Sequence, residues 1–344
     1  MLIYILKRIA LMLPTLLGAL TITFLVIQFV PGGPIDQILA EARDSGGGDT
    51  GGYRASRDTD EKQIAELKKL YGFDKPVHIR YFEMLANFAR FDLGRSFMHN
   101  KDVWELIKEK LPVSISLGLW SFLLSYLISV PLGISKAMRE GSRFDTLTTF
   151  AVLVGYAIPG FVLGILLIVL FAGGSFWDVF PLRGLTSDNW EELSFMGKVK
   201  DYFWHLTLPL ICLSIHSFAV ITMLTKNTFV EEIRKQYVLV ARAKGLSQKG
   251  VLYRHIFRNA LLPLVTHFPA AFIGAFFAGS VLIETLFSLD GMGLLGYEAI
   301  VRRDYPVVLG TLYFFTLIAV VTKLISDILY RVIDPRVQFG SVSK

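Results

Sequence analysis

Few side chains in the apolar stretches of this sequence could ionise or exchange protons. Three of the six histidines, His205, His216 and His267, stand inside uncharged stretches. An ionisable group in such a setting is costly, so it marks a candidate pathway or binding site. We expect His205 at the outer edge of its stretch, while His216 and His267 serve either helix packing or a transport pathway. Lys323 and Asp327 have the spacing of neighbours on one helix face, and we expect them to pair.

Patterns typical of enzymes are missing from the sequence. The histidines are scattered, and neither His-x-x-x-His nor Gly-x-Ser-x-Gly occurs. The phosphate-binding pattern Gly-x-x-x-x-Gly-Lys-Ser/Thr is also missing, so we expect no nucleotide site. The lone Cys212 excludes a disulfide within the chain and opposes a metal cluster. These observations predict a protein that is not an enzyme and that binds no cofactor or metal itself.

Long uncharged stretches decide the class of the protein. A helix rises about 1.5 Å per residue, so about 20 apolar residues cross a hydrocarbon layer about 30 Å thick. Six stretches are near or above that length: Ile9–Val30, Leu111–Ser135, Thr146–Trp177, Tyr202–Thr225, Asn259–Ile283 and Tyr305–Thr322. The alternative is a soluble protein with buried core helices, which a mean hydropathy of +0.51 opposes. We therefore predict an all-α polytopic membrane protein with six transmembrane helices.

The third apolar stretch contains helix-breaking residues. Pro159 stands among Gly155, Gly160 and Gly164, and proline interrupts the hydrogen bonds of a helix. Small residues also let helices approach closely. We expect a kinked, tightly packed segment here, with pore shaping at Pro159 as the alternative role.

The basic residues predict the orientation in the membrane. The loop 226–258 has eight Lys and Arg against two acidic residues, and Lys136, Arg139 and Arg143 form a second basic loop. Cytoplasmic loops carry an excess of Lys and Arg. Both termini and these loops are therefore predicted to be cytoplasmic. The net charge of +6 is explained by this asymmetry and does not indicate nucleic-acid binding.

Three regions follow from this topology. Residues 1–30 form the cytoplasmic end and first transmembrane helix, residues 31–110 an extracytoplasmic segment, and residues 111–344 the main transmembrane domain with a cytoplasmic loop at 226–262. The outer segment has a glycine-rich stretch at 44–57 and two apolar stripes with helical spacing. These stripes either pack on the membrane body or contact a soluble partner.

The cytoplasmic loop contains an amphipathic pattern. Phe229, Ile233, Tyr237, Val240 and Ala241 recur at helical spacing, which predicts one helix from Phe229 to Lys244 with Glu231 and Lys235 paired on its other side. Gly245 suits the left-handed position after a helix end. Ser247 is expected to cap a second helix, from Gln248 to about Arg258. The apolar face meets either the membrane body or a partner, unless the loop merely lies at the lipid interface.

This loop resembles the cytoplasmic loop of ABC-importer permeases. The resemblance is carried by Ala241-Arg-Ala-Lys-Gly245-Leu-Ser247 and by His255-Ile-Phe-Arg258-Asn-Ala-Leu-Leu-Pro263. The generic motif has Glu where this chain has Leu239, a departure that resembles the dipeptide/oligopeptide/nickel branch. Phe91-Asp-Leu-Gly-Arg-Ser96, Gly291-Met-Gly293 and Arg303-Asp-Tyr-Pro306 resemble outer segments of that branch. With the glycine-rich insertion, the chain is most similar to the YejB-type permeases, a family associated with peptides and microcin C.

The resemblance implies a permease subunit of the bacterial inner membrane. It implies separate ATP-binding-cassette subunits that hold ATP and Mg²⁺, a second and related but non-identical permease chain, a periplasmic solute-binding protein, and a peptide substrate, with microcin C as one candidate. The residues expected to couple the chain to its ATPase are Tyr237, Val240, Ala241, Lys244, Gly245, Leu246 and Ser247. Candidate pathway residues are His216, His267 and Pro159. A proton- or sodium-coupled carrier is disfavoured because the apolar stretches lack carboxylates.

Overall fold

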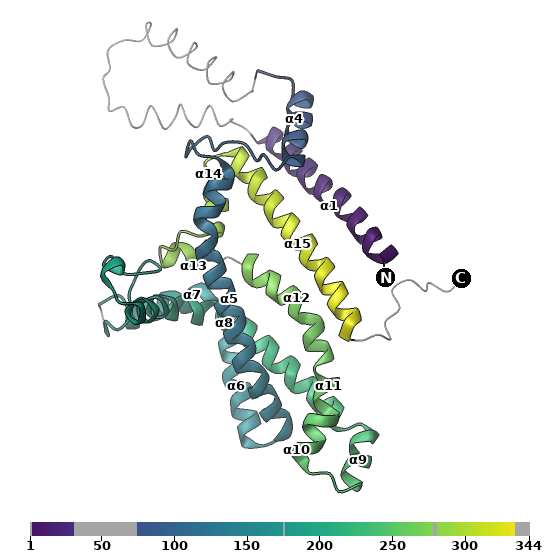
Figure 1. Ribbon diagram of the computed structural model, residues 1–344. Coiled ribbons are helices and arrows are strands. Elements are labelled where there is room, and N and C mark those ends of the chain that lie inside the picture. Colours follow the sequence, from purple (N-terminus) through teal and green to yellow (C-terminus); the bar gives the residue numbers. More distant parts are fainter. Residues whose placement is uncertain (1, 31–73, 175, 278–280, 334–344) are drawn as a thin grey trace. The chain divides into compact units, whose positions relative to one another are not determined.

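The computed structural model describes residues 2–30, 74–174, 176–277 and 281–333 (Figure 1). Helices dominate these ranges, and β structure in them is limited to a single antiparallel bridge between Arg95 and Asp102. The predicted all-α class is therefore confirmed for the described residues. The glycine-rich stretch and the first apolar stripe of the outer segment lie outside them.

The chain divides into two compact units. The first unit comprises Met1–Lys110 and Leu295–Ile318, and the second comprises Leu111–Leu294 and Ala319–Lys344. Two long helices, α5 (Val103–Met138) and α15 (Tyr305–Ile333), begin in the first unit and continue in the second.

The first unit also contains α1 (Leu2–Phe29), α4 (Val77–Ala89) and most of α14 (Met292–Val301). Hydrogen bonds join the end of α1 to α4, between Thr21 Oγ1 and Tyr81 OH at 2.7 Å and from Arg80 Nη2 to Gln28 Oε1 at 2.7 Å. Phe88 of the second predicted stripe is buried against Tyr313, with ring centroids 5.2 Å apart, whereas Phe82 of the same stripe is 65% exposed.

Two of the outer sequence motifs are joined by hydrogen bonds in the first unit. The buried carboxylate of Asp304 accepts hydrogen bonds from Ser96 Oγ at 2.5 Å and from the Phe97 amide at 3.1 Å. A buried carboxylate is costly unless its oxygens have donors. The Phe91–Ser96 and Arg303–Pro306 segments thus form one structural element, although 207 residues separate Phe97 from Asp304.

The second unit holds the remaining helices. Their bounds are α6 (Arg143–Ala157), α7 (Gly160–Phe171), a 3₁₀ turn (Trp190–Glu192), α8 (Phe195–Ile233), α9 (Gln236–Ala243), α10 (Gln248–Val251), a π-helical turn (Leu252–Ile256), α11 (Phe257–Ala260), α12 (Leu262–Phe277) and α13 (Val281–Leu286). The 39-residue α8 packs against α6, α7 and α11. Figure 1 shows α9, α10 and α11 gathered at one end of this unit.

Within the described ranges, four helices are long and apolar enough to cross a membrane. They are Ile5–Phe29 within α1, α5, α8 and Tyr305–Ile328 within α15, and they match the first, second, fourth and sixth apolar stretches. A fifth span results if the bent pair α6–α7 counts as one. The fifth apolar stretch contains α12, whose 16 residues are fewer than the roughly 20 that a span requires. Six spans therefore remain a prediction.

The third apolar stretch is bent by 96° between α6 and α7. Pro159 stands at the bend, and the preceding Ile158 is extended (φ −86°, ψ 119°) because the proline ring disfavours a helical residue before it. A Cβ on Gly160 would lie 2.8 Å from the Cys212 carbonyl oxygen, and one on Gly164 would lie 2.6 Å from Leu286 Cδ2. The glycines therefore permit the close packing that the sequence predicts.

The Gly291-Met-Gly293 motif surrounds a buried carboxylate. Glu284 is fully buried, and its Oε2 accepts a hydrogen bond of 2.7 Å from the Leu294 amide in the first turn of α14. A Cβ on Gly291 would lie 2.7 Å from the carboxyl carbon of Glu284. Glycine at 291 is thus required by the approach of this side chain.

Candidate functional site

The cytoplasmic loop does not form the single helix predicted from Phe229 to Lys244. Helix α8 ends at Ile233 and α9 begins at Gln236, with Lys235 extended between them (ψ 149°). The buried Glu232 accepts hydrogen bonds from Lys235 Nζ at 2.7 Å and from Tyr237 OH at 2.9 Å. Residues five apart do not face each other on a continuous helix, so the break lets Glu232 meet Tyr237. The predicted pairing of Lys235 with Glu231 is present only at 3.9 Å, because Glu232 is the closer partner.

The break changes which face of α9 is buried. Val238 and Ala241 are buried, whereas Val240 is 53% exposed and Leu239 57% exposed. The prediction that Tyr237, Val240 and Ala241 share the apolar face is therefore wrong for Val240. Val238 was missed, because the extended Lys235 lets α9 turn relative to α8, so the buried side of α9 does not continue the stripe of Phe229 and Ile233.

A compact apolar cluster seats α9 on the rest of the second unit. We call it the loop cluster; its buried members are Ala137, Phe229, Val238, Ala241, Val251, Leu252, Ile256 and Ala260. Tyr237 and Leu246 are half-buried against it. Val238 and Ala241 thus lie in one cluster with residues of α5, α8, α10, the π-helical turn and α11, while Lys244 and Ser247 are exposed.

Tyr237 belongs to a hydrogen-bond network inside the loop. Its hydroxyl also accepts a hydrogen bond of 3.2 Å from Asn259 Nδ2. Burial raises the pKa of Tyr237, and the hydrogen bond to the Glu232 carboxylate raises the pKa of Lys235. The neutral phenol and the charged lysine are therefore the stable forms at neutral pH, and both hold the turn between α8 and α9.

Gly245 and Ser247 have the conformations predicted for them. Gly245 has φ +78°, and its amide donates to the Arg242 carbonyl at 2.9 Å. Ser247 Oγ accepts a hydrogen bond of 3.2 Å from the Gly250 amide and so caps α10. The second predicted helix is present as α10, the π-helical turn and α11 in succession.

The resemblance of this loop to the cytoplasmic loop of ABC-importer permeases implies that Gly245→Val impairs coupling between ATP hydrolysis and transport. A Cβ at this position meets nothing within 4 Å, so the cost is that of the left-handed backbone, about 1–2 kcal/mol or more for a β-branched residue. The measurement is substrate transported per ATP hydrolysed by the reconstituted complex. Gly245→Asn is the control, because Asn tolerates positive φ. Equal loss in both variants, or none in the Val variant, would contradict this role.

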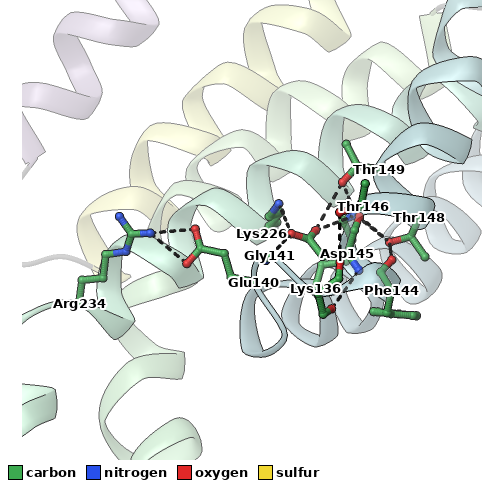
Figure 2. Close-up of polar contacts among 11 residues, drawn as sticks. Lys136, Glu140, Gly141, Phe144, Asp145, Thr146, Thr148, Thr149, Lys226 and Arg234 are labelled. Carbon is green, nitrogen blue, oxygen red and sulfur yellow. Dashed lines mark hydrogen bonds and ion pairs between the residues drawn. The ribbon is translucent and has the colours of Figure 1, made fainter.

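A buried charged cluster lies beside the loop cluster, and the sequence did not reveal it. Figure 2 shows Asp145 of α6 between Lys136 of α5 and Lys226 of α8. Lys136 is fully buried, and its Nζ donates to the Asp145 carbonyl, Thr148 Oγ1 and Thr149 Oγ1 at 2.7–2.9 Å. Lys226 Nζ donates to Asp145 Oδ2 at 2.7 Å. The one local signal was Ser142-Arg-Phe-Asp145, a helix-capping pattern whose Ser142 Oγ accepts from the Asp145 amide.

The candidate pathway residues are not brought into one site. His216 stacks on Tyr156, with ring centroids 4.3 Å apart, which favours its packing role. Pro159 marks the bend before α7, and His267 lies on α12 with its side chain outside the described part. His205 is buried, and its Nδ1 lies 2.9 Å from the Asp201 carbonyl oxygen. The predicted pair of Lys323 and Asp327 is confirmed at 3.8 Å.

Known proteins are similar in sequence to this chain over almost its whole length. Residues 129–339 match the family model described as binding-protein-dependent transport system inner membrane component. The chain is 55% identical to the peptidoglycan transport system permease protein YejB of Agrobacterium fabrum and 51% identical to the inner membrane ABC transporter permease protein YejB of Escherichia coli O157:H7, each over 98% of both chains. It is 33% identical to the di/tripeptide permease DppB of Pseudomonas aeruginosa over 98% of this chain and 99% of that protein. The chain therefore belongs to the family of binding-protein-dependent transport system inner membrane components, as a permease subunit of an ABC importer.

Proposed function

We propose that this permease forms part of the translocation pathway for oligopeptides or peptide-like compounds. The observation that carries the proposal is the similarity over 98% of the chain to permeases named for peptidoglycan and di/tripeptide transport. Peptides cross-linked in peptidoglycan and free short peptides share a backbone of amides, so one pathway suits both. Microcin C, which also contains a peptide, is a candidate of the same class.

The proposed machine has several chains. ATP and Mg²⁺ are held by partner ATPase subunits, because the sequence has no phosphate-binding loop. A second permease chain, related but non-identical, completes the pathway within the lipid, and a periplasmic binding protein delivers the substrate. Driven by the ATPase, the permeases alternate between two states, of which ATP stabilises one.

The orientation proposed from the basic loops has support in the second unit. Asp145 pairs with Lys226, and Glu140 pairs with Arg234 at 2.8 Å, so the loop after α5 and the loop after α8 lie at the same end of their helices. We propose that this end is cytoplasmic, with both termini on that side and six spans in all.

The ATPase is proposed to dock on the exposed face of α9. Leu239 and Val240 are large apolar side chains that remain open to solvent, and Lys244 and Gly245 follow at the exposed end of the helix. A buried apolar anchor with a polar rim is the usual anatomy of a protein interface. Ala241, buried in the loop cluster, transmits force within the permease and does not contact the ATPase.

Reconstitution in vesicles tests the proposed function. We expect labelled short peptides and peptidoglycan-derived peptides to enter only when this chain is combined with the second permease, the ATPases, the binding protein and ATP. Nickel or sugar uptake with ATP, without peptide uptake, would overturn the substrate class. Peptide uptake by this chain alone under a proton gradient would replace the importer with a carrier.

A further inference from the structure

We propose that Asp145 is a positioning residue that ties α8 to the α5–α6 hairpin, so that movement of the docked loop displaces the three helices together. The proposal rests on the proposed function, since it assigns a route by which the ATPase's motion reaches the spans. It concerns the Asp145 cluster, defined as Lys136, Asp145, Thr148, Thr149 and Lys226.

One carboxylate in this cluster bridges three helices. Asp145 Oδ1 lies 3.2 Å from Lys136 Nζ of α5, and Oδ2 lies 2.7 Å from Lys226 Nζ of α8. The Gly141 amide, in the turn between α5 and α6, also donates to Oδ2 at 3.2 Å. The side chain of Asp145 is only 6% exposed, so water screens these contacts little.

The two lysines depend on Asp145 to different degrees. Lys136 already directs hydrogen bonds to the Asp145 carbonyl and to the two threonine hydroxyls, so its donors are satisfied without the carboxylate. Lys226 is held by the carboxylate itself. The ion pair between Asp145 of the hairpin and Lys226 of α8 can therefore be removed without leaving the buried Lys136 short of hydrogen-bond partners.

The Asp145 cluster adjoins the loop that the ATPase would move. One helical turn beyond Lys226, Phe229 enters the loop cluster with Val238 and Ala241, and Ala137 enters it next to Lys136. On the other side, a Cβ on Gly133 would lie 2.5 Å from Thr225 Cβ, so α5 and α8 touch at the same level. A displacement of α9 is thus transmitted to the end of α8 through the loop cluster, and the ion pair of Lys226 with Asp145 transmits it to α6.

A buried ion pair contributes little net stability but fixes geometry, whereas removing one partner leaves an uncompensated charge. Lys226→Met cuts the link at its less buried partner, whose side chain is 16% exposed, and keeps Asp145 paired with Lys136. We expect this variant to assemble with its partners normally and to transport at least about 10-fold less substrate per ATP hydrolysed. Lys226→Arg should retain coupling, because it preserves the charge and the contact with Asp145 Oδ2 is a single hydrogen bond rather than a bidentate one.

Lys198→Met is the matched control. Lys198 lies near the opposite end of α8 and pairs with the exposed Glu191 at 3.4 Å, so its loss should leave the transport ratio unchanged. Spin labels at Arg143 and Glu231, both exposed, give a second readout that needs no substrate. In the wild-type complex their separation should be the same with and without ATP, and in Lys226→Met it should change on ATP binding.

The outcomes separate this proposal from the proposed function. If the wild-type complex imports no peptide but the label distances behave as expected, the substrate class is wrong and the link stands. The link would be overturned if Lys226→Met transported as much substrate per ATP as the wild type and its label distance did not change on ATP binding. Equal loss in Lys226→Met and Lys226→Arg would overturn it too, since packing and not charge would then be responsible.

Discussion

Ala241→Glu should unfold the cytoplasmic loop of the isolated permease. Ala241 is 5% exposed and packs with Phe229, Val238 and Ile256 in the loop cluster. A carboxylate placed there would lie among the apolar side chains of the loop cluster, and an unpaired buried charge costs several kcal/mol. The measurement is limited proteolysis of the detergent-purified chain, in which cleavage between residues 235 and 258 should become much faster.

Ala243→Glu provides the control for this substitution. Ala243 is exposed on the same helix, so the same new side chain remains in water and the loop should resist protease as the wild type does. Equal protease resistance of both variants would place Ala241 outside the cluster. Because neither measurement includes the ATPase, loss of loop structure is distinguished from loss of docking.

The long helices could be predicted from the sequence because few backbone structures satisfy their hydrogen bonds in lipid. An uncharged stretch must satisfy its backbone internally, and α1, α5, α8 and α15 do so. The bend at Pro159 was predicted because proline interrupts the hydrogen bonds of a helix. Its size of 96° was not predictable, because it depends on how Gly160 and Gly164 pack against Cys212 and Leu286, which come from distant segments.

Within the candidate site, local features were predictable and paired features were not. Gly245 and Ser247 act on neighbouring backbone, so residue type was enough to predict their roles. The break before α9 lets the Tyr237 hydroxyl reach the Glu232 carboxylate, and the hydrophobic periodicity of the sequence gives no sign of this contact. The Asp145 cluster joins residues 81 positions apart, and on sequence alone Lys136 and Lys226 had indicated only orientation.

Val240→Glu should detach the ATPase while leaving the permease folded. Val240 is 53% exposed on α9, so the new carboxylate stays in water when the chain is alone. With the ATPase docked on α9 as proposed, the carboxylate would lie within a desolvated contact. Disrupting a central interface residue costs about 2 kcal/mol or more, which is a loss of at least about 30-fold in affinity. Co-purification of the ATPase should fall accordingly, with protease resistance of the loop unchanged.

Val301→Glu is the matched control for this prediction. Val301 is 54% exposed on α14, in the segment that the proposed topology places on the extracytoplasmic side of the membrane, so the same substitution should retain the ATPase. If both variants kept the ATPase, Val240 would lie outside the interface, and the next candidate on the loop would be Tyr253, which is 64% exposed in the π-helical turn. If Val301→Glu also lost the ATPase, general damage to the complex would explain the loss. A selective loss in Val240→Glu, beside an unfolded loop in Ala241→Glu, would assign adjacent residues of α9 to opposite partners: Val240 to the ATPase and Ala241 to the permease itself.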